Sequence, residues 1–315
     1  ATTEIYTLSL HDALPISDTT ESAAASEEAT EAVGEAEASD AQLVIAGGDS
    51  AGLIAAVQAA AEGMDPSKIL ILAPGEELAA DMAEMAPYVN AANTDEQFQA
   101  NLTDDFEIYL SDIMTAGNNT NNSDMAADVS ENSEEAKDWL ADTLGMEYGD
   151  LTQEAGSTVA RSFPAKEGNL NELVQEALLK KVEELKIPVE YKTELKSVAY
   201  DEEGALDRIT VTVDGKDQEI DCLALVATDV SLIPVFEESQ VYEADGKAAA
   251  LVVSNNAEQL NKDSGELING LYAAGPILSA AVDGEGVLSG NELTEAVVFG
   301  STAGTEAAVY VSDNQ

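Results

Sequence analysis

The sequence is poor in basic residues, histidine and cysteine, and each shortage excludes a class of function. Thirteen Lys and Arg face 62 Asp and Glu, which gives a formal net charge of −49 at pH 7. Such a surface repels phosphate backbones and anionic lipid, so we expect no nucleic acid and no membrane surface as a partner. The single cysteine, Cys222, excludes an internal disulfide and a cysteine-based metal site, and its apolar neighbours predict a buried side chain. No run of residues is apolar and long enough to cross a bilayer.

The single histidine lies in a segment that does not resemble natural protein sequence. Residues 1–16, ATTEIYTLSLHDALPI, back-translate in one frame to a common sequencing adaptor, and we interpret them as a sequencing artefact. Without His11, the chain has no imidazole to act as an acid, a base or a metal ligand.

Residues 17–40 are small and acidic, which is typical of a disordered tether. They carry too little apolar surface to offset the entropy lost on ordering. This composition favours an extracytoplasmic protein, exported and tethered to or released from a bacterial surface, whose signal sequence is not in this fragment. A linker that follows another domain is the alternative.

From residue 42 the pattern becomes that of a nucleotide-binding βαβ unit. It predicts a buried strand, a tight turn, a helix and a second strand over residues 42–46, 47–52, 53–62 and 68–73. In Rossmann-type units the glycines let the backbone approach a pyrophosphate, which accepts hydrogen bonds from N–H groups at the helix N-terminus. Here Asp49 replaces the second glycine, and Ala73 replaces the acidic residue that binds ribose hydroxyls. The unit predicts the fold, but by itself it leaves open both dinucleotide binding and a purely structural turn.

Three later stretches resemble the fumarate reductase/succinate dehydrogenase flavoprotein family. Residues 111–148 carry the D-W-L motif and Leu-Gly turn of a family helix, and residues 169–228 match its helix, β-meander and return strand. Residues 268–308 resemble the closing signature I-x-G-L-Y-A-A-G-E followed by L-G-G-N-A-L-x-x-A-x-x-F-G. The resemblance implies an α/β, three-layer FAD/NAD(P)-binding (Rossmann-like) fold over residues 41–315, with a parallel central sheet and a β-meander.

The resemblance also implies FAD as the cofactor and a flavin- or haem-bearing redox partner. With one cysteine and no histidine outside residues 1–16, we expect no metal site. The expected cofactor-binding residues lie in the glycine turn, at the ends of the return and closing strands, and at the start of the last helix: Gly47, Gly48, Ser50, Ala51, Gly52, Ala227, Thr228, Gly275, Ser289, Gly290, Asn291 and Leu293.

Several family features that hold the substrate are replaced. Family members insert a substrate-capping domain after the return strand, and the segment 228–270 is too short to contain one. The histidine and arginine that bind substrate carboxylates correspond to about Asp283 and to Val287, although carboxylates need fixed cations. Arg161 is the one candidate catalytic residue that remains, and Phe163 takes the place of a neighbouring histidine.

The flavin-binding positions are altered as well. Asp229 replaces the first residue of a glycine pair, Pro276 replaces a glutamate, and Glu292 adds a carboxylate where the turn donates N–H groups. Two interpretations therefore remain open. The chain is either a fumarate-reductase-like FAD-binding flavoprotein with a redox or electron-transfer role that cannot itself reduce fumarate, or a non-catalytic pseudo-flavoprotein that acts as a partner or scaffold subunit. Whether it is an enzyme stays open.

Overall fold

The computed structural model describes residues 40–213 and 215–315. The predicted artefact and all of the predicted tether except Asp40 lie outside the described residues. No helix among the described residues is long and apolar enough to cross a membrane. The elements, in chain order, are β1 Leu43–Ala46, α1 Ser50–Ala61, η2 Pro66–Lys68, β2 Ile69–Ala73, η3 Ala80–Ala83, β3 Tyr88–Asn90, α2 Asp95–Gln99, α3 Phe106–Ala116, α4 Ser123–Glu131, α5 Ser133–Leu144, β4 Ser162–Pro164, α6 Leu170–Leu185, β5 Val189–Tyr191, β6 Thr193–Tyr200, β7 Leu206–Val213, β8 Lys216–Ile220, β9 Ala224–Ala227, η4 Val230–Val235, β10 Val241–Ala244, β11 Lys247–Leu251, β12 Glu258–Leu260, β13 Leu267–Ala273, α7 Pro276–Asp283 and α8 Asn291–Asp313.

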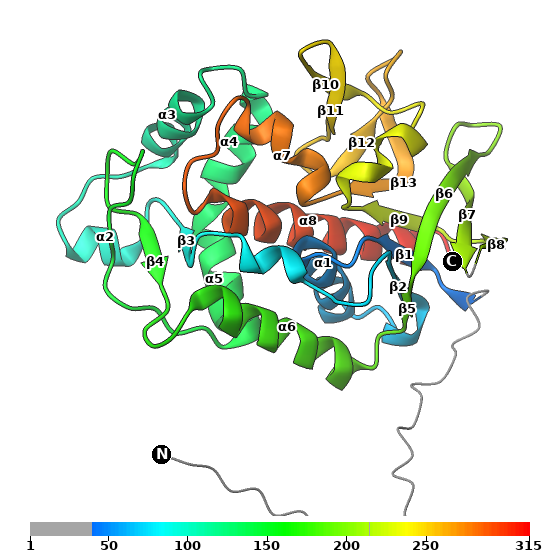
Figure 1. The fold of residues 1–315 in the computed structure, drawn as a ribbon, viewed down its shortest axis with the longest axis horizontal. Helices are drawn as coiled ribbons and strands as arrows, with labels where there is room; N and C mark the ends of the chain where they lie inside the picture. Colours follow the sequence, from blue (N-terminus) through cyan, green and yellow to red (C-terminus); the bar gives the residue numbers. More distant parts are fainter. Residues whose placement is uncertain (1–39, 214) are drawn as a thin grey trace, which may run out of the picture. The chain divides into compact units, whose positions relative to one another are not determined.

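The central layer of the described chain is a six-stranded sheet in the order β12-β13-β9-β1-β2-β5 (Figure 1). All neighbouring pairs are parallel except β12 with β13, which are antiparallel. The strands β1, β2 and β9 are apolar and buried along their whole length, as expected for parallel strands covered on both faces. The predicted α/β fold is therefore confirmed, with an antiparallel edge strand that the sequence pattern did not predict.

Helices α1 and α8 pack closely against each other on one face of the sheet (Figure 1). The close approach depends on two glycines of α8. A Cβ at Gly300 would lie 2.8 Å from the carbonyl oxygen of Ala51, and a Cβ at Gly304 would lie 2.4 Å from that of Ala55. The antiparallel β6–β7–β8 meander packs on β2 and β13 on the other side (Figure 1). The predicted three layers are therefore present.

The segment between β9 and β13 consists of the short helix η4, the β10–β11 hairpin and strand β12. The prediction that the substrate-capping domain is missing rests on this segment. Cys222, just before β9, is buried as predicted, and burial raises the pKa of its thiol to about 12.

Candidate functional site

The turn from β1 to α1 meets the ends of β9 and β13 at one point. Gly47 has φ +145°, and a Cβ there would overlap Thr228 Oγ1. Gly275 has φ +68°, and a Cβ there would lie 2.5 Å from the Cβ of Ala51. The structure thus brings the predicted residues of the glycine turn together with those that follow the return and closing strands. They meet at the carboxyl ends of parallel strands, where open α/β sheets bind ligands.

Two carboxylates hold the N–H groups at the start of α1. Asp49 accepts a hydrogen bond from the Gly52 N–H at 3.0 Å and another from the Thr228 hydroxyl at 2.5 Å. Asp81, from η3, accepts from the Ser50 N–H at 3.0 Å and from the Ser50 hydroxyl at 2.6 Å. These backbone donors are the ones that a helix N-terminus offers to a phosphate.

Burial, followed by the nearby Asp81 carboxylate, raises the pKa of Asp49 to about 7. The Thr228 and Gly52 hydrogen bonds act in the opposite direction but do not cancel this effect. Asp49 therefore carries a proton in a large part of the molecules near neutral pH.

The second half of the predicted site lies at the start of α8. Gly290 is left-handed (φ +88°), and a Cβ there would lie 2.5 Å from the ring of Tyr88. The Tyr88 hydroxyl bonds to Ser289 Oγ at 2.6 Å, and Asn90 Nδ2 donates to the Ser289 carbonyl at 2.9 Å. The Gly290 N–H donates to Glu292 Oε2 at 3.1 Å. The Glu292 carboxylate thus occupies an N–H group that the turn was predicted to offer to the flavin. Helix α8 thus begins with its own carboxylate on the first donor of the turn.

Two further carboxyl groups lie close to this turn. Burial, together with the neighbouring Asp283 carboxylate, raises the pKa of Glu295 well above its usual range. Burial likewise raises the pKa of Asp283 to about 7. Asp283, which the resemblance places at about the position of a substrate-binding cation, is thus part of a carboxyl pair with Glu295. The other replacement, Val287, is an exposed side chain.

Two of the cavities in the described chain are lined by predicted site residues or their neighbours. One, of about 370 Å³, is bordered by Gly47, the end of β2, the start of β6 and Asp229. The other, of about 280 Å³, is lined by Glu84, Met85, Gly275, Pro276, Ser279, Glu292, Glu295 and Ala296. It connects the two halves of the predicted site. Neither set of lining residues, all within the described chain, includes a Lys or an Arg.

The backbone frame fits the diphosphate part of FAD. An anion already sits on the donors at the start of α1, since the Asp81 carboxylate accepts from the Ser50 N–H as a phosphate oxygen would. Gly47, Gly52 and Thr228 would line the diphosphate, and the turn of Ser289, Gly290 and Asn291 would line the flavin. Leu293, also predicted, is fully buried in α8.

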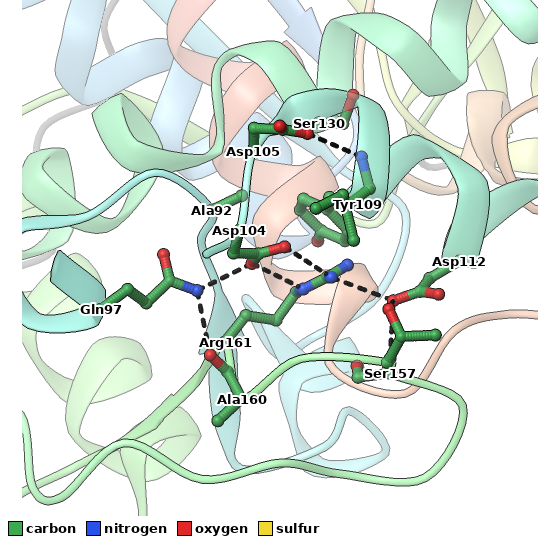
Figure 2. Close-up of polar contacts among 12 residues, drawn as sticks. Ala92, Gln97, Asp104, Asp105, Tyr109, Asp112, Ser130, Ser157, Ala160 and Arg161 are labelled. Carbon is green, nitrogen blue, oxygen red and sulfur yellow. Dashed lines mark hydrogen bonds and ion pairs between the residues drawn. The ribbon is translucent and has the colours of Figure 1, made fainter. Parts of the chain in front are cut away.

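Arg161, the predicted catalytic residue, lies in a buried ion-pair cluster that Figure 2 shows. Its Nε and Nη2 donate to the two carboxylate oxygens of Asp104 at 3.1 and 2.8 Å, and Nη2 lies 3.0 Å from Asp112 Oδ2. Gln97 Nε2 also donates to Asp104, and the Thr158 N–H and hydroxyl donate to Asp112. The Arg161 side chain is 0% exposed, so in this conformation it faces two carboxylates instead of a cavity.

Tyr109 connects this cluster to the start of α8. Its ring centroid lies 4.5 Å from the Arg161 guanidinium carbon, and its hydroxyl donates to Asn291 Oδ1 at 2.6 Å. Burial raises the pKa of the Tyr109 hydroxyl. The role of Arg161 in contacting a substrate stays a prediction. Its recorded contacts are with Asp104, Asp112 and the ring of Tyr109, and Tyr109 in turn bonds to Asn291.

Sequence reasoning missed Asp81, Tyr88, Asn90 and Tyr109. Each reaches the site from a segment of ordinary composition, and no spacing or motif marks it. The one available signal was negative: with the second glycine replaced by Asp49, some compensating change near the turn was to be expected.

The comparisons with known proteins agree with this geometry. The sequence profile of the FAD binding domain family matches residues 42–206. An NADH:fumarate oxidoreductase of Klebsiella pneumoniae is 29% identical over 127 residues, which is 40% of this chain and 13% of that protein. A fumarate reductase (cytochrome) of Shewanella frigidimarina is 28% identical over 120 residues, which is 38% of this chain and 20% of that protein. The matched part is thus at most a fifth of these curated relatives.

Among solved structures, the open conformation of a flavocytochrome c3 fumarate reductase superposes with a TM-score of 0.70 at 14% identity. The superposition covers 86% of this chain and 78% of that one. A 3-ketosteroid-Δ4-(5α)-dehydrogenase from Rhodococcus jostii superposes with a TM-score of 0.66 at 15% identity, covering 85% of this chain and 96% of that one. These similarities establish the fold.

Proposed function

The chain belongs to the FAD-binding domain family, among its fumarate-reductase-like flavoproteins, and on that premise we propose that it is a redox or electron-transfer unit that does not itself reduce fumarate. FAD is the cofactor of this family and, when bound, supplies two-electron and hydride chemistry. The residues of the chain would supply the cradle: N–H groups of the glycine turn for the diphosphate, and the Gly290 turn for the flavin.

The proposal that the chain does not reduce fumarate is supported by the absence of an available Lys or Arg side chain among the described residues that line the two cavities. Arg161 is fully buried and paired with Asp104 and Asp112, and the described residues that line the two cavities include no Lys or Arg. A dicarboxylate would instead meet Glu84, Glu292 and Glu295. Because fixed cations are needed to hold and polarise such a substrate, this site disfavours its binding.

An anaerobic dye assay tests the proposal. FAD-loaded protein is mixed with a reduced viologen dye, with and without fumarate, and a known fumarate reductase run in parallel validates the assay. We expect the same rate of dye oxidation with and without fumarate. Fumarate-dependent turnover above about one per second, within the usual range for enzymes, would contradict the proposal, because a substitute substrate site would then exist.

We also propose that a haem- or flavin-bearing protein exchanges electrons with this unit outside the cytoplasm. The support is that matched relatives are named as a cytochrome-type fumarate reductase and an NADH:fumarate oxidoreductase, and that the strongly acidic composition suits an extracytoplasmic protein. Reduction of the bound flavin by candidate donors, followed by its visible absorbance, measures this directly.

A non-catalytic scaffold is the second candidate. One observation favours it: the donors that FAD needs at the start of α1 are held by Asp49 and Asp81. Protein purified without flavin, and unable to take up FAD at any pH, would favour this candidate.

A further inference from the structure

The α1 N-terminus carries an anion that belongs to the chain itself. The Ser50 N–H and hydroxyl both donate to the Asp81 carboxylate, and the Gly52 N–H donates to the Asp49 carboxylate. Asp49 is the local helix cap, but Asp81 comes from 31 residues further along the chain. A local cap satisfies α1 by itself, so the second carboxylate is an additional, long-range contact.

The segment that carries Asp81 is anchored over the glycine turn. The Ala79 N–H donates to the Gly48 carbonyl at 2.7 Å, and Gln175 Nε2 of α6 donates to the Ala79 carbonyl at 2.9 Å. Leu78 packs against Gly48 closely enough that a Cβ there would lie 3.0 Å from its Cδ2. Met82 is 1% exposed. Asp81 is therefore held on its donors by packing on both sides of it in the sequence.

The charged groups next to this pair and in the two cavities near it are acidic. Asp81 and Glu84 come from the η3 segment, Asp229 follows β9, Glu194 lies in β6, and Glu292 and Glu295 begin α8. The described residues that line the two adjacent cavities supply no cation. A diphosphate that binds here must displace Asp81 from Ser50, and it lies beside Asp49 in a region that already carries negative charge.

We propose that Asp49 and Asp81 form an internal anion that competes with the FAD diphosphate for the N-terminus of α1, so that FAD binds with uptake of a proton at Asp49 and release of Asp81 from Ser50. The inference rests on the proposed function, in that FAD is the ligand. The further claim is that two carboxylates control the FAD affinity: Asp49, in place of the second glycine, and Asp81, from outside the glycine turn.

The direction of the pH dependence follows from the charges. Because a bound diphosphate disfavours the ionised form of Asp49 still further, the complex holds that proton to higher pH than the free protein does. Above about pH 7, where Asp49 of the free protein is ionised, each pH unit therefore weakens FAD binding about tenfold for one proton taken up. Below about pH 6 the affinity becomes nearly constant.

Equilibrium titration of the apo-protein with FAD tests this, followed by quenching of flavin fluorescence at pH 5.5, 7.0 and 8.5 and constant ionic strength. The variants are Asp49→Asn, Asp81→Asn and the double variant. Asp65→Asn is the matched control, since Asp65 also caps a helix, at Ser67, but is exposed and lies away from the turn. We expect Asp81→Asn to bind FAD about tenfold or more tightly at every pH, because one charge-assisted hydrogen bond no longer competes.

We expect Asp49→Asn to lose the pH dependence between pH 7.0 and 8.5, and Asp65→Asn to behave as the unaltered protein does. A calorimetric titration of the unaltered protein at pH 7.5, in buffers of different ionisation enthalpy, should detect the uptake of about one proton per FAD. That measurement needs no variant, so a folding defect in a variant does not affect it.

The outcomes separate the two claims. Equal, pH-independent affinity of all proteins would refute the internal anion and leave FAD binding intact. FAD binding by the double variant alone would support the internal anion and refute FAD binding by the unaltered chain. The absence of binding by every protein, including the double variant, would refute both.

Discussion

Replacing Arg161 with methionine should destabilise the fold strongly, because the substitution leaves two carboxylates without their cation. Arg161 Nη2 lies 2.8 Å from Asp104 Oδ1 and 3.0 Å from Asp112 Oδ2, and the side chains of these three residues are at most 5% exposed. Removing one partner from a buried ion pair costs about 3–5 kcal/mol of unfolding free energy, since the remaining charge stays buried and unpaired.

The chain offers a matched control in Arg208→Met. Arg208 also pairs with two carboxylates, Asp207 and Glu219, but its side chain is 42% exposed. Exposed pairs of this kind contribute little, because water screens them. We therefore expect Arg208→Met to unfold at nearly the same urea concentration as the unaltered protein.

Urea unfolding followed by the fluorescence of Trp139, the only tryptophan, measures both variants. Trp139 Nε1 donates to Gln58 Oε1 at 2.7 Å, so the indole reports on the contact between α5 and α1. The measurement is made at pH 5 and pH 8. Burial raises the pKa of Asp104 even with Arg161 present, and loss of the guanidinium raises it further, so the deficit of Arg161→Met should be smaller at pH 5. A deficit below about 1 kcal/mol, or one that is equal at both pH values, would refute the assignment of a buried ion-pair cluster.

Two further predictions concern the glycine turn and the helix pair beneath it. Asp49 has a folded pKa of about 7 against a usual 3.8, so its contribution to stability is fully present below about pH 4 and is lost as the pH rises to about 7. Subtracting the pH–stability curve of Asp49→Asn from that of the unaltered protein should show this fall. Parallel curves for the two proteins would contradict the prediction. Gly304→Val should cost about 1–3 kcal/mol in urea unfolding, because its Cβ would lie 2.4 Å from the Ala55 carbonyl oxygen; an unchanged midpoint would mean that α8 moves freely away from α1.

Much of the fold could be predicted because its signals are local. The apolar runs over residues 42–46 and 68–73 coincide with β1 and β2, and the helix and return strand that the resemblance implies within residues 169–228 are α6 and β9. Gly300 and Gly304 let α8 approach α1 closely, but the sequence alone did not identify α1 as the partner of these glycines. The antiparallel edge strand β12 could not be predicted, because its direction depends on a path through η4 and the hairpin that no local pattern specifies.

The sequence by itself predicted a cofactor-binding frame and showed that carboxylates replace several of its residues. Gly47, Gly52 and Gly290 could be identified from spacing and family resemblance, and Asp49 and Glu292 could be recognised as carboxylates at positions that need donors. These features depend on neighbours only a few residues apart in the chain.

Only the tertiary structure decided where the remaining charges lie. Asp81 reaches Ser50 from 31 residues away, and Arg161 meets Asp104 across 57 residues. The sequence alone predicted Arg161 as a candidate substrate contact. It could not show which side chains would lie next to this arginine in the folded protein. Folding surrounded it with two carboxylates and the ring of Tyr109. Ion pairs between residues so far apart in the sequence form only when whole helices and strands pack together. The energy that fixes them comes from burial and not from any local preference of the chain.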